Sequence, residues 1–196
     1  MKMRDWMNNN SALVTVGAVV VLILSLGYIV WSSKGPGYGP RVIDIYYYDL
    51  NTKQVFVGKS DQYPPIDAPS GRGYKLPNGQ EIPAGVRAYV FACGECPDVT
   101  GLSLDELQAK NAFVAYVEMY TMEVRDMLMK QAAGEAPSGP EQEGMMYEMF
   151  ERGQLIADPA KLTWVLANTE QAMQIQSSLE GRCPGPEPIQ PCLPGR

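Results

Sequence analysis

Residues 85–92 read GVRAYVFA, and this stretch decides the fold. Small aliphatic side chains alternate along it with larger ones. The small set is Val86, Ala88 and Val90, and the large set is Arg87, Tyr89 and Phe91. A period of two places the two sets on opposite faces of a β-strand. The stretch therefore predicts the central strand of a sheet, and it leads directly into a Cys-Gly-Glu-Cys motif at residues 93–96.

Two further parts of the first half show strand and turn patterns. Residues 41–50 (RVIDIYYYDL) alternate in the same way, and a turn at 51–53 leads into residues 54–57 (QVFV), which predicts a hairpin. The Asn-Gly pair at 78–79 suits the tight turn of a second hairpin. The three tyrosines at 46–48 have two interpretations, a stacking platform for a sugar or nucleotide and cross-strand packing, and strand propensity favours the second.

The second half of the chain carries helical signals. Ser103 followed by Glu106 forms a capping box, which begins helices. The apolar side chains that follow fall within about 60° of one direction on a helix, so we expect a long amphipathic helix packed on the sheet. These side chains are Phe113, Tyr116, Val117, Tyr120, Val124, Met127 and Leu128. We expect shorter helices around residues 145–152 and from 168 to 181, and a small hairpin about 158–159. Strands followed by helices predict an α+β domain.

An apolar segment near the N-terminus begins at Ala12, ends at Trp31 and contains no charged residue. At about 1.5 Å per residue it spans roughly 30 Å, the thickness of the hydrocarbon core of a bilayer. A helix that is apolar all round belongs in lipid. The sequence therefore predicts a transmembrane helix over residues 12–32, with the lipid bilayer as its partner.

A cleaved signal peptide is the rival interpretation, because Lys2 and Arg4 form a positive segment ahead of the apolar run. The run is longer than the ~7 to 15 residues of such a peptide and no Ala-x-Ala follows it, which favours an uncleaved anchor. Lys34 and Arg41 nearly balance the basic residues before the span. The short basic tail still favours a cytoplasmic N-terminus, with the rest of the chain outside the cytoplasmic membrane.

These signals divide the chain into an anchor and one exported domain. The expected parts are a short basic tail at 1–11, the transmembrane helix at 12–32, a Gly/Pro linker at 33–40, an α+β extracytoplasmic domain at 41–182 and a Pro-rich tail at 183–196. We expect the Pro-rich tail to be solvated and fixed by a disulfide, rather than to be a ligand for a proline-binding domain.

The four cysteines allow three interpretations. Cys93 and Cys96 have the spacing of a thiol-redox motif, but Pro97 follows directly and disfavours the helical geometry that activates such a thiol. Together with Cys183 and Cys192 they could ligate zinc, although the second pair is wider than usual zinc spacings. We favour structural disulfides and expect Cys183 to pair with Cys192. Pairing of Cys93 or Cys96 with the later cysteines is equally allowed, because spacing does not fix connectivity.

The composition excludes several classes of function. The 196 residues include no histidine, which removes Ser/His/Asp and Cys/His relays and imidazole metal ligands. A net charge of −6 with scattered basic residues argues against a nucleic-acid partner. The carboxylates of the expected long helix favour a solvated face over an acid–base site; they are Asp105, Glu106, Glu118, Glu123 and Asp126. We expect no catalytic residue, no enzymatic activity and no cofactor, with zinc as the alternative.

Three stretches carry a resemblance: YYYDLNT at 46–52, PPIDAPSG at 64–71 and GVRAYVFACGEC at 85–96. Together with the anchor, they resemble an uncharacterised group of bacterial single-pass membrane proteins with a small exported domain. The resemblance transfers no catalytic residue. We expect a membrane-tethered domain that binds a protein partner in the membrane or envelope or contributes to envelope structure. The alternative function is a thiol-redox or zinc-binding protein that uses Cys93 and Cys96.

Overall fold

The computed structural model describes residues 10–33, 41–135, 148–149, 151–179, 181–183 and 185–195. The chain divides into two compact units, Met1–Arg41 and Val42–Arg196. Residues 1–9 of the expected tail (1–11) and residues 34–40 of the expected linker (33–40) lie outside the described residues, and so do residues 145–147 and 150 of the short helix expected around 145–152.

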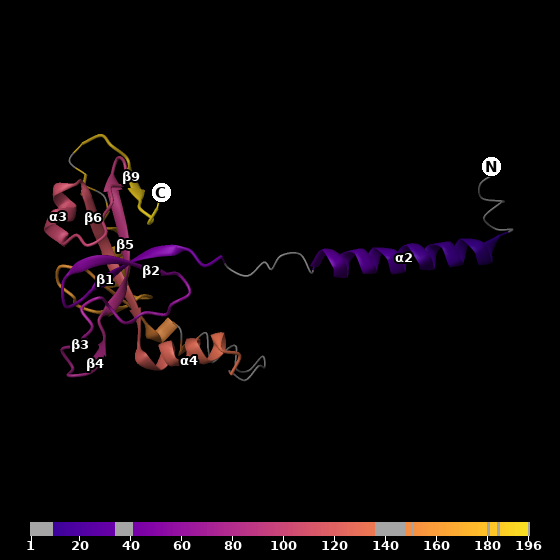
Figure 1. Ribbon diagram of the computed structural model, residues 1–196, viewed down its shortest axis with the longest axis horizontal. Coiled ribbons are helices and arrows are strands. Elements are labelled where there is room, and N and C mark those ends of the chain that lie inside the picture. The colour runs from indigo at the N-terminus through magenta and orange to yellow at the C-terminus, as the bar shows by residue number, and fades with distance from the viewer. Residues whose placement is uncertain are drawn as a thin grey trace. The chain divides into compact units, whose positions relative to one another are not determined.

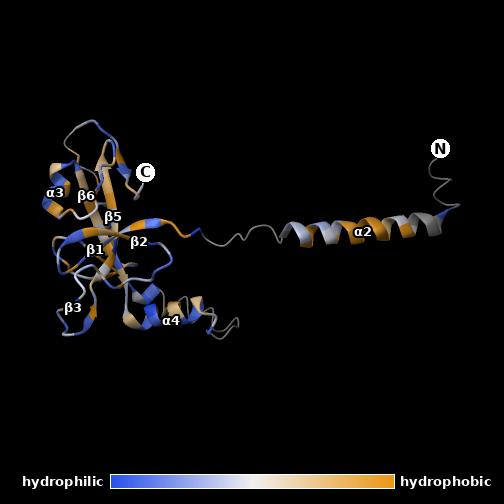
Figure 2. Cartoon of the chain, viewed as in Figure 1, coloured by the Kyte–Doolittle hydropathy of each residue, from blue (hydrophilic) through white to orange (hydrophobic). Residues whose placement is uncertain are grey.

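The first unit contains a long apolar helix, α2 (Ser11–Ser33; Figures 1 and 2). Its window Thr15–Ser32 is long and apolar enough to cross a membrane, and none of its residues is buried. The hydroxyl of Ser25 donates to the backbone carbonyl of Val21 at 2.7 Å, so this polar group is satisfied inside the helix. The predicted N-terminal apolar helix is confirmed.

The second unit is built on a sheet of seven strands in which neighbouring strands run antiparallel. The order is β2-β1-β5-β6-β7-β8, with β9 also paired to β5. The strands are β1 (Asp44–Asp49), β2 (Gln54–Lys59), β5 (Gly85–Cys93), β6 (Ala112–Tyr120), β7 (Gln154–Ala157), β8 (Val165–Leu166) and β9 (Ile189–Pro191). The predicted central strand and the predicted β1–β2 hairpin are both confirmed.

A second, two-stranded sheet pairs β3 (Gly73–Lys75) with β4 (Glu81–Pro83). Its turn contains Gly79 at a φ of 87°, and the Asn78 side chain accepts a hydrogen bond from the Gln80 N–H at 3.0 Å. The predicted Asn-Gly hairpin is therefore confirmed.

The prediction of one long helix is wrong. The structure has α3 (Leu104–Ala109), then strand β6, then α4 (Met122–Ala132). The capping box does form, because the Glu106 carboxylate accepts hydrogen bonds from the N–H and the hydroxyl of Ser103 at 2.8 and 2.7 Å. The helix ends early, and Asn111 turns the chain with a φ of 56°.

A strand replaces the middle of the expected helix because residues 112–120 (AFVAYVEMY) are rich in β-branched and aromatic side chains. Most of β6 is buried on both faces, which removes the alternation that marks a half-exposed strand. Its continuous apolar run therefore also fits a helical stripe, and periodicity alone does not distinguish the two structures.

The last part of the chain returns to the sheet. β7 and β8 form the small hairpin expected about residues 158–159, and α6 (Glu170–Ser177) follows, with the Thr169 side chain as its N-cap. β9 lies in the stretch expected to be a solvated tail. It pairs with the second half of β5, on the edge where β1 pairs with the first half.

The main hydrophobic core lies on one face of β5. Val86, Ala88 and Val90 point into it, and Leu107 of α3 and Ile82 of β4 are buried in the same cluster. Burial of each large aliphatic side chain contributes about 1.5–3 kcal/mol to stability. The other face of β5 carries larger side chains that stay partly exposed.

Candidate functional site

The cysteines form two disulfides in the structure. Cys93 is bonded to Cys183 and Cys96 to Cys192, with Sγ–Sγ distances of 1.98 and 2.01 Å. The expected pairing of Cys183 with Cys192 is wrong. β9 lies between these two cysteines and runs antiparallel along β5, so both of them reach the Cys-Gly-Glu-Cys motif rather than each other. The disulfides indicate an oxidising, non-cytoplasmic compartment.

Neither alternative role of the motif has a formed site in the described residues. Among them, no group of three or more Cys, His, Asp or Glu side chains is placed to hold a metal ion. Cys93 and Cys96 are each bonded to a distant cysteine and not to each other, whereas a thiol–disulfide exchange site alternates between free thiols and a bond within its own motif.

The three consecutive tyrosines offer no stacking platform, because Tyr46, Tyr47 and Tyr48 are all buried. The Tyr47 ring stacks on Phe56, and its hydroxyl donates to the Lys59 carbonyl at 2.9 Å. The cross-strand packing interpretation is confirmed.

A polar cluster lies on the face of the sheet opposite the main hydrophobic core. Glu118 is 3% exposed, and its carboxylate accepts a hydrogen bond from the Tyr89 hydroxyl at 2.9 Å and faces an Arg87 nitrogen at 3.9 Å. Burial, followed by the charge of Glu118, raises the pKa of Tyr89 well above its ordinary value. Glu118 was expected on a solvated helix face, and that expectation is wrong because the residue lies in β6. Asp105, Glu106, Glu123 and Asp126 are exposed, as expected.

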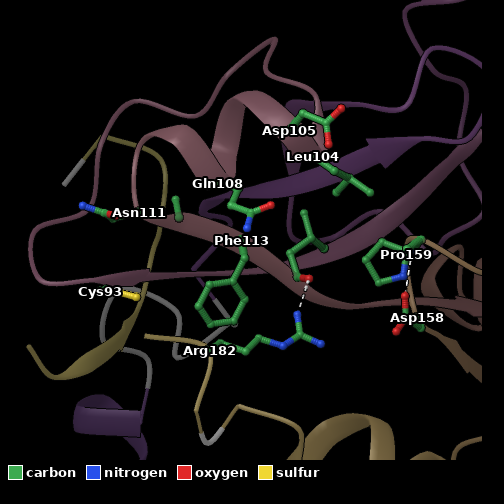
Figure 3. Close-up of a pocket in the computed structure, with 12 residues that line it drawn as sticks. Cys93, Leu104, Asp105, Gln108, Asn111, Phe113, Asp158, Pro159 and Arg182 are labelled. Atoms are coloured by element: carbon green, nitrogen blue, oxygen red, sulfur yellow. Dashed lines mark hydrogen bonds between the residues drawn. The ribbon is translucent and has the colours of Figure 1, made fainter. Parts of the chain in front are cut away.

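A cavity of about 670 Å³ opens beside the first half of β6 (Figure 3). Helix α3 forms one wall and the turn after β7 forms another, while Arg182 reaches in from the segment that follows α6. The lining residues are Cys93, Leu104, Asp105, Gln108, Asn111, Ala112, Phe113, Val114, Asp158, Pro159, Ala160 and Arg182.

The floor of this cavity is an open strand edge. β6 pairs with β5 from Ala112 to Glu118, but β7 pairs with it only from Val117 to Tyr120. In the part of the chain that the structure describes, no strand pairs with residues 112–116 on the β7 side. Sequence reasoning could not find this edge, because residues 112–116 were assigned to a helix.

Arg182 lies across the open edge. Its Nη1 donates to the Val114 carbonyl at 3.3 Å, and its guanidinium carbon lies 5.1 Å from the centre of the Phe113 ring. Its Nε and Nη2 donate to the carbonyl and the hydroxyl of Ser178, at 2.9 and 3.1 Å. Among the described residues, no carboxylate lies within ion-pair distance of this guanidinium.

The disulfide network holds Arg182 in place, since Cys183 follows it directly and is bonded to Cys93 at the end of β5. No sequence motif marks Arg182, because its role depends on a contact with Val114, 68 positions earlier in the chain. The cavity therefore combines an unpaired strand edge, an apolar floor and one cation that makes only neutral contacts there.

Comparisons with models of protein families, with curated proteins and with solved structures find no match to this chain.

Proposed function

We propose that this chain is a single-pass membrane protein whose disulfide-linked α+β domain lies outside the cytoplasm and binds a protein partner without catalysing a reaction. The observation that carries the proposal is the occurrence, in one chain, of an apolar helix of membrane-spanning length and two long-range disulfides. An anchor and an oxidised domain in one chain are typical of a membrane-tethered exported protein.

The chemistry of the domain supports binding over catalysis. The sequence has no histidine, and the two buried carboxylates of the described residues, Asp49 and Glu118, are engaged by structural hydrogen bonds. The cavity at the β6 edge offers backbone groups and an apolar floor, which suit the recognition of a peptide better than bond cleavage.

Thiol labelling in intact cells tests the compartment and the orientation. Cells that express the full chain are treated with a membrane-impermeant, mass-shifting maleimide, with and without prior reduction. The proposal predicts no shift until a reductant is added, and a shift of all four cysteines afterwards. A single cysteine introduced in place of exposed Lys75 is the matched control, because it has no disulfide partner and should react without reduction.

Two results would overturn the proposal. If labelling requires lysis but no reductant, the domain is cytoplasmic and its thiols are free, and zinc binding by the four cysteines then becomes the leading interpretation. If the Lys75→Cys control also requires lysis, the orientation is inverted whatever the state of the native cysteines.

A further inference from the structure

We propose that the open edge of β6 binds an extended peptide of a partner protein as an added strand, antiparallel to β6, with a carboxylate of the peptide paired to Arg182. This inference rests on the proposed function and names the class of partner that the domain takes.

The geometry of the edge defines the added strand. The Val114 carbonyl points away from β5, because it accepts the hydrogen bond from Arg182. On the other side, Val90, which lies opposite Val114, directs its carbonyl to the Cys192 N–H at 2.9 Å. The Val90–Val114 pair is therefore not a hydrogen-bonded one, and the Val114 N–H also faces the open edge.

The length of the groove limits the ligand. Asn111 turns the chain at one end, and β7 occupies the edge from Val117 onward at the other. Residues 112–116 leave at most about 16 Å of edge between these ends, because the register shift at Ala115 shortens the strand, and this length fits no more than about five residues of extended peptide. Pro159 in the turn after β7 prevents that strand from continuing along the edge, since proline cannot donate to a ladder.

The edge itself is not protected in the usual way. Open edges commonly carry charged side chains or proline, which discourage pairing with another chain. Residues 112–116 read AFVAY and contain neither, and the irregularity of this stretch is the register shift against β5 between Val114 and Tyr116. Ala112 and Val114 are only 1% and 2% exposed, and Arg182 is the side chain that hydrogen-bonds to the Val114 carbonyl. A peptide must therefore displace this one of the three Arg182 hydrogen bonds, and a peptide N–H can replace it while the two bonds to Ser178 remain.

The charges give the peptide a direction. Ala157 of β7 lies opposite Val117, so Asp158 stands at the Tyr116 end of the open edge, while Arg182 lies at Phe113 and Val114. An antiparallel peptide runs in the direction of β7, which places its amino end toward Asp158 and its carboxylate toward Arg182. A carboxylate would give this guanidinium the charged acceptor that the described residues do not supply.

The same charges disfavour a second copy of the chain as the occupant. Two identical edges pair antiparallel about a two-fold axis perpendicular to the sheet, so equivalent residues meet on the same face. An axis close to Val114 would bring the two Arg182 side chains together, and this like-charge contact opposes self-association.

A synthetic library of random linear heptapeptides tests the proposal. The full chain in phospholipid nanodiscs is incubated with the library, in free-acid and C-terminally amidated forms, and retained peptides are identified by mass spectrometry after subtraction of those bound to empty nanodiscs. We expect retained peptides to carry an Asp or Glu side chain, or to be retained only as the free acid. The first result assigns the carboxylate to a side chain and the second assigns it to the peptide terminus.

Three variants distinguish peptide binding in the groove from a general effect of the protein's charge. Arg182→Gln should weaken the binding of the retained peptides by about 10-fold or more, because a charged hydrogen bond is lost. Arg72→Gln removes the same charge from an exposed site in another loop and should leave affinity unchanged. Gln108→Trp, on the exposed side of α3, fills the groove and tests the site again if Arg182→Gln does not fold. Hydrogen exchange of the amides in residues 112–116 should slow when peptide binds.

The proposal is overturned if no peptide is retained, if Arg182→Gln and Gln108→Trp bind as tightly as the native chain, or if peptide slows exchange elsewhere and not in residues 112–116. A dimer that Gln108→Trp abolishes would make a second copy the occupant and would also overturn it. These failures differ from failure of the proposed function, because thiol labelling can still report an exported, oxidised domain when no peptide binds.

Discussion

Ser70 donates two hydrogen bonds to the buried carboxylate of Asp49, one from its backbone N–H at 3.0 Å and one from its hydroxyl at 3.1 Å. The Asn51 N–H donates a third at 2.9 Å. Asp49 is 1% exposed, and it joins the end of β1 to the loop that precedes β3. Two of the stretches that carry the sequence resemblance, residues 46–52 and 64–71, are therefore held together by one carboxylate.

Replacing Asp49 should destabilise the domain. Asp49→Asn puts an NH₂ group where an oxygen accepts, which leaves a buried donor without its bond and should cost about 1–3 kcal/mol. Urea unfolding of the variant and of the native chain measures this difference. Asp67→Asn, at an exposed position in the same loop, is the control and should unfold at the native midpoint. Equal midpoints for the two variants would show that the Asp49–Ser70 contact contributes no stability.

The disulfide connectivity predicts which thiol a single substitution releases. Cys93→Ser should leave one free thiol, at Cys183, whereas Cys96→Ser should free Cys192. Alkylation of the unreduced protein, followed by tryptic digestion and tandem mass spectrometry, locates the label within the peptide that begins at Cys183. Release of Cys192 by Cys93→Ser would contradict the structure.

Stability should fall in alkaline solution. Burial, then the charge of Asp49, raises the pKa of Tyr48 to about 12, and burial, then Glu118, raises that of Tyr120 to about 12. Unfolded tyrosines ionise near pH 10, so above this pH the folded state keeps protons that the unfolded state loses. The stabilisation is complete below about pH 10 and is lost as the pH rises toward the folded values.

Urea midpoints between about pH 8 and pH 11 measure this loss. Tyr89→Phe should make the decline shallower, because burial and Glu118 also raise the pKa of Tyr89. Midpoints that stay constant across this range would contradict the prediction.

Gly85 should not tolerate a side chain. A Cβ atom there would lie 2.8 Å from the Ile66 carbonyl oxygen and 2.9 Å from the Phe56 ring, and the Ile66 backbone is fixed by two hydrogen bonds to Gly85 itself. Gly85→Ala should cost about 1–3 kcal/mol by overpacking. Gly185→Ala, where no atom lies within 4 Å of the added Cβ, is the matched control and should be neutral in thermal unfolding. A neutral Gly85→Ala would show that β5 and the loop at 64–71 can move apart freely.

The sequence predicted those parts of the fold whose signals are local. β5 alternates cleanly, the turn at Gly79 needs positive φ, and Ser103 with Glu106 caps a helix within four residues. β6 was missed because it is buried on both faces. Its assignment depends on the strands beside it, which are distant in the chain.

The site was less accessible to sequence reasoning than the fold. All four cysteines were recognised as disulfide candidates, but their pairing depends on β9 lying along β5, and a three-residue strand in a Pro-rich segment carries no pattern. The groove depends on where β7 stops pairing and on Arg182 reaching Val114. Both are properties of the assembled sheet rather than of any segment.

Both disulfides join the middle of the chain to its last fourteen residues, and this arrangement sets an order of events during biosynthesis. A chain that has been extended only to residue 182 already contains strands β1 to β8, but it has neither bond and the outer half of the β5 edge is uncovered. Oxidation can therefore lock the domain only after residue 192 has reached the oxidising side. Formation of the two bonds thus reports that residues 183–192 have reached an oxidising compartment, and a chain that stops before residue 183 would lack both bonds.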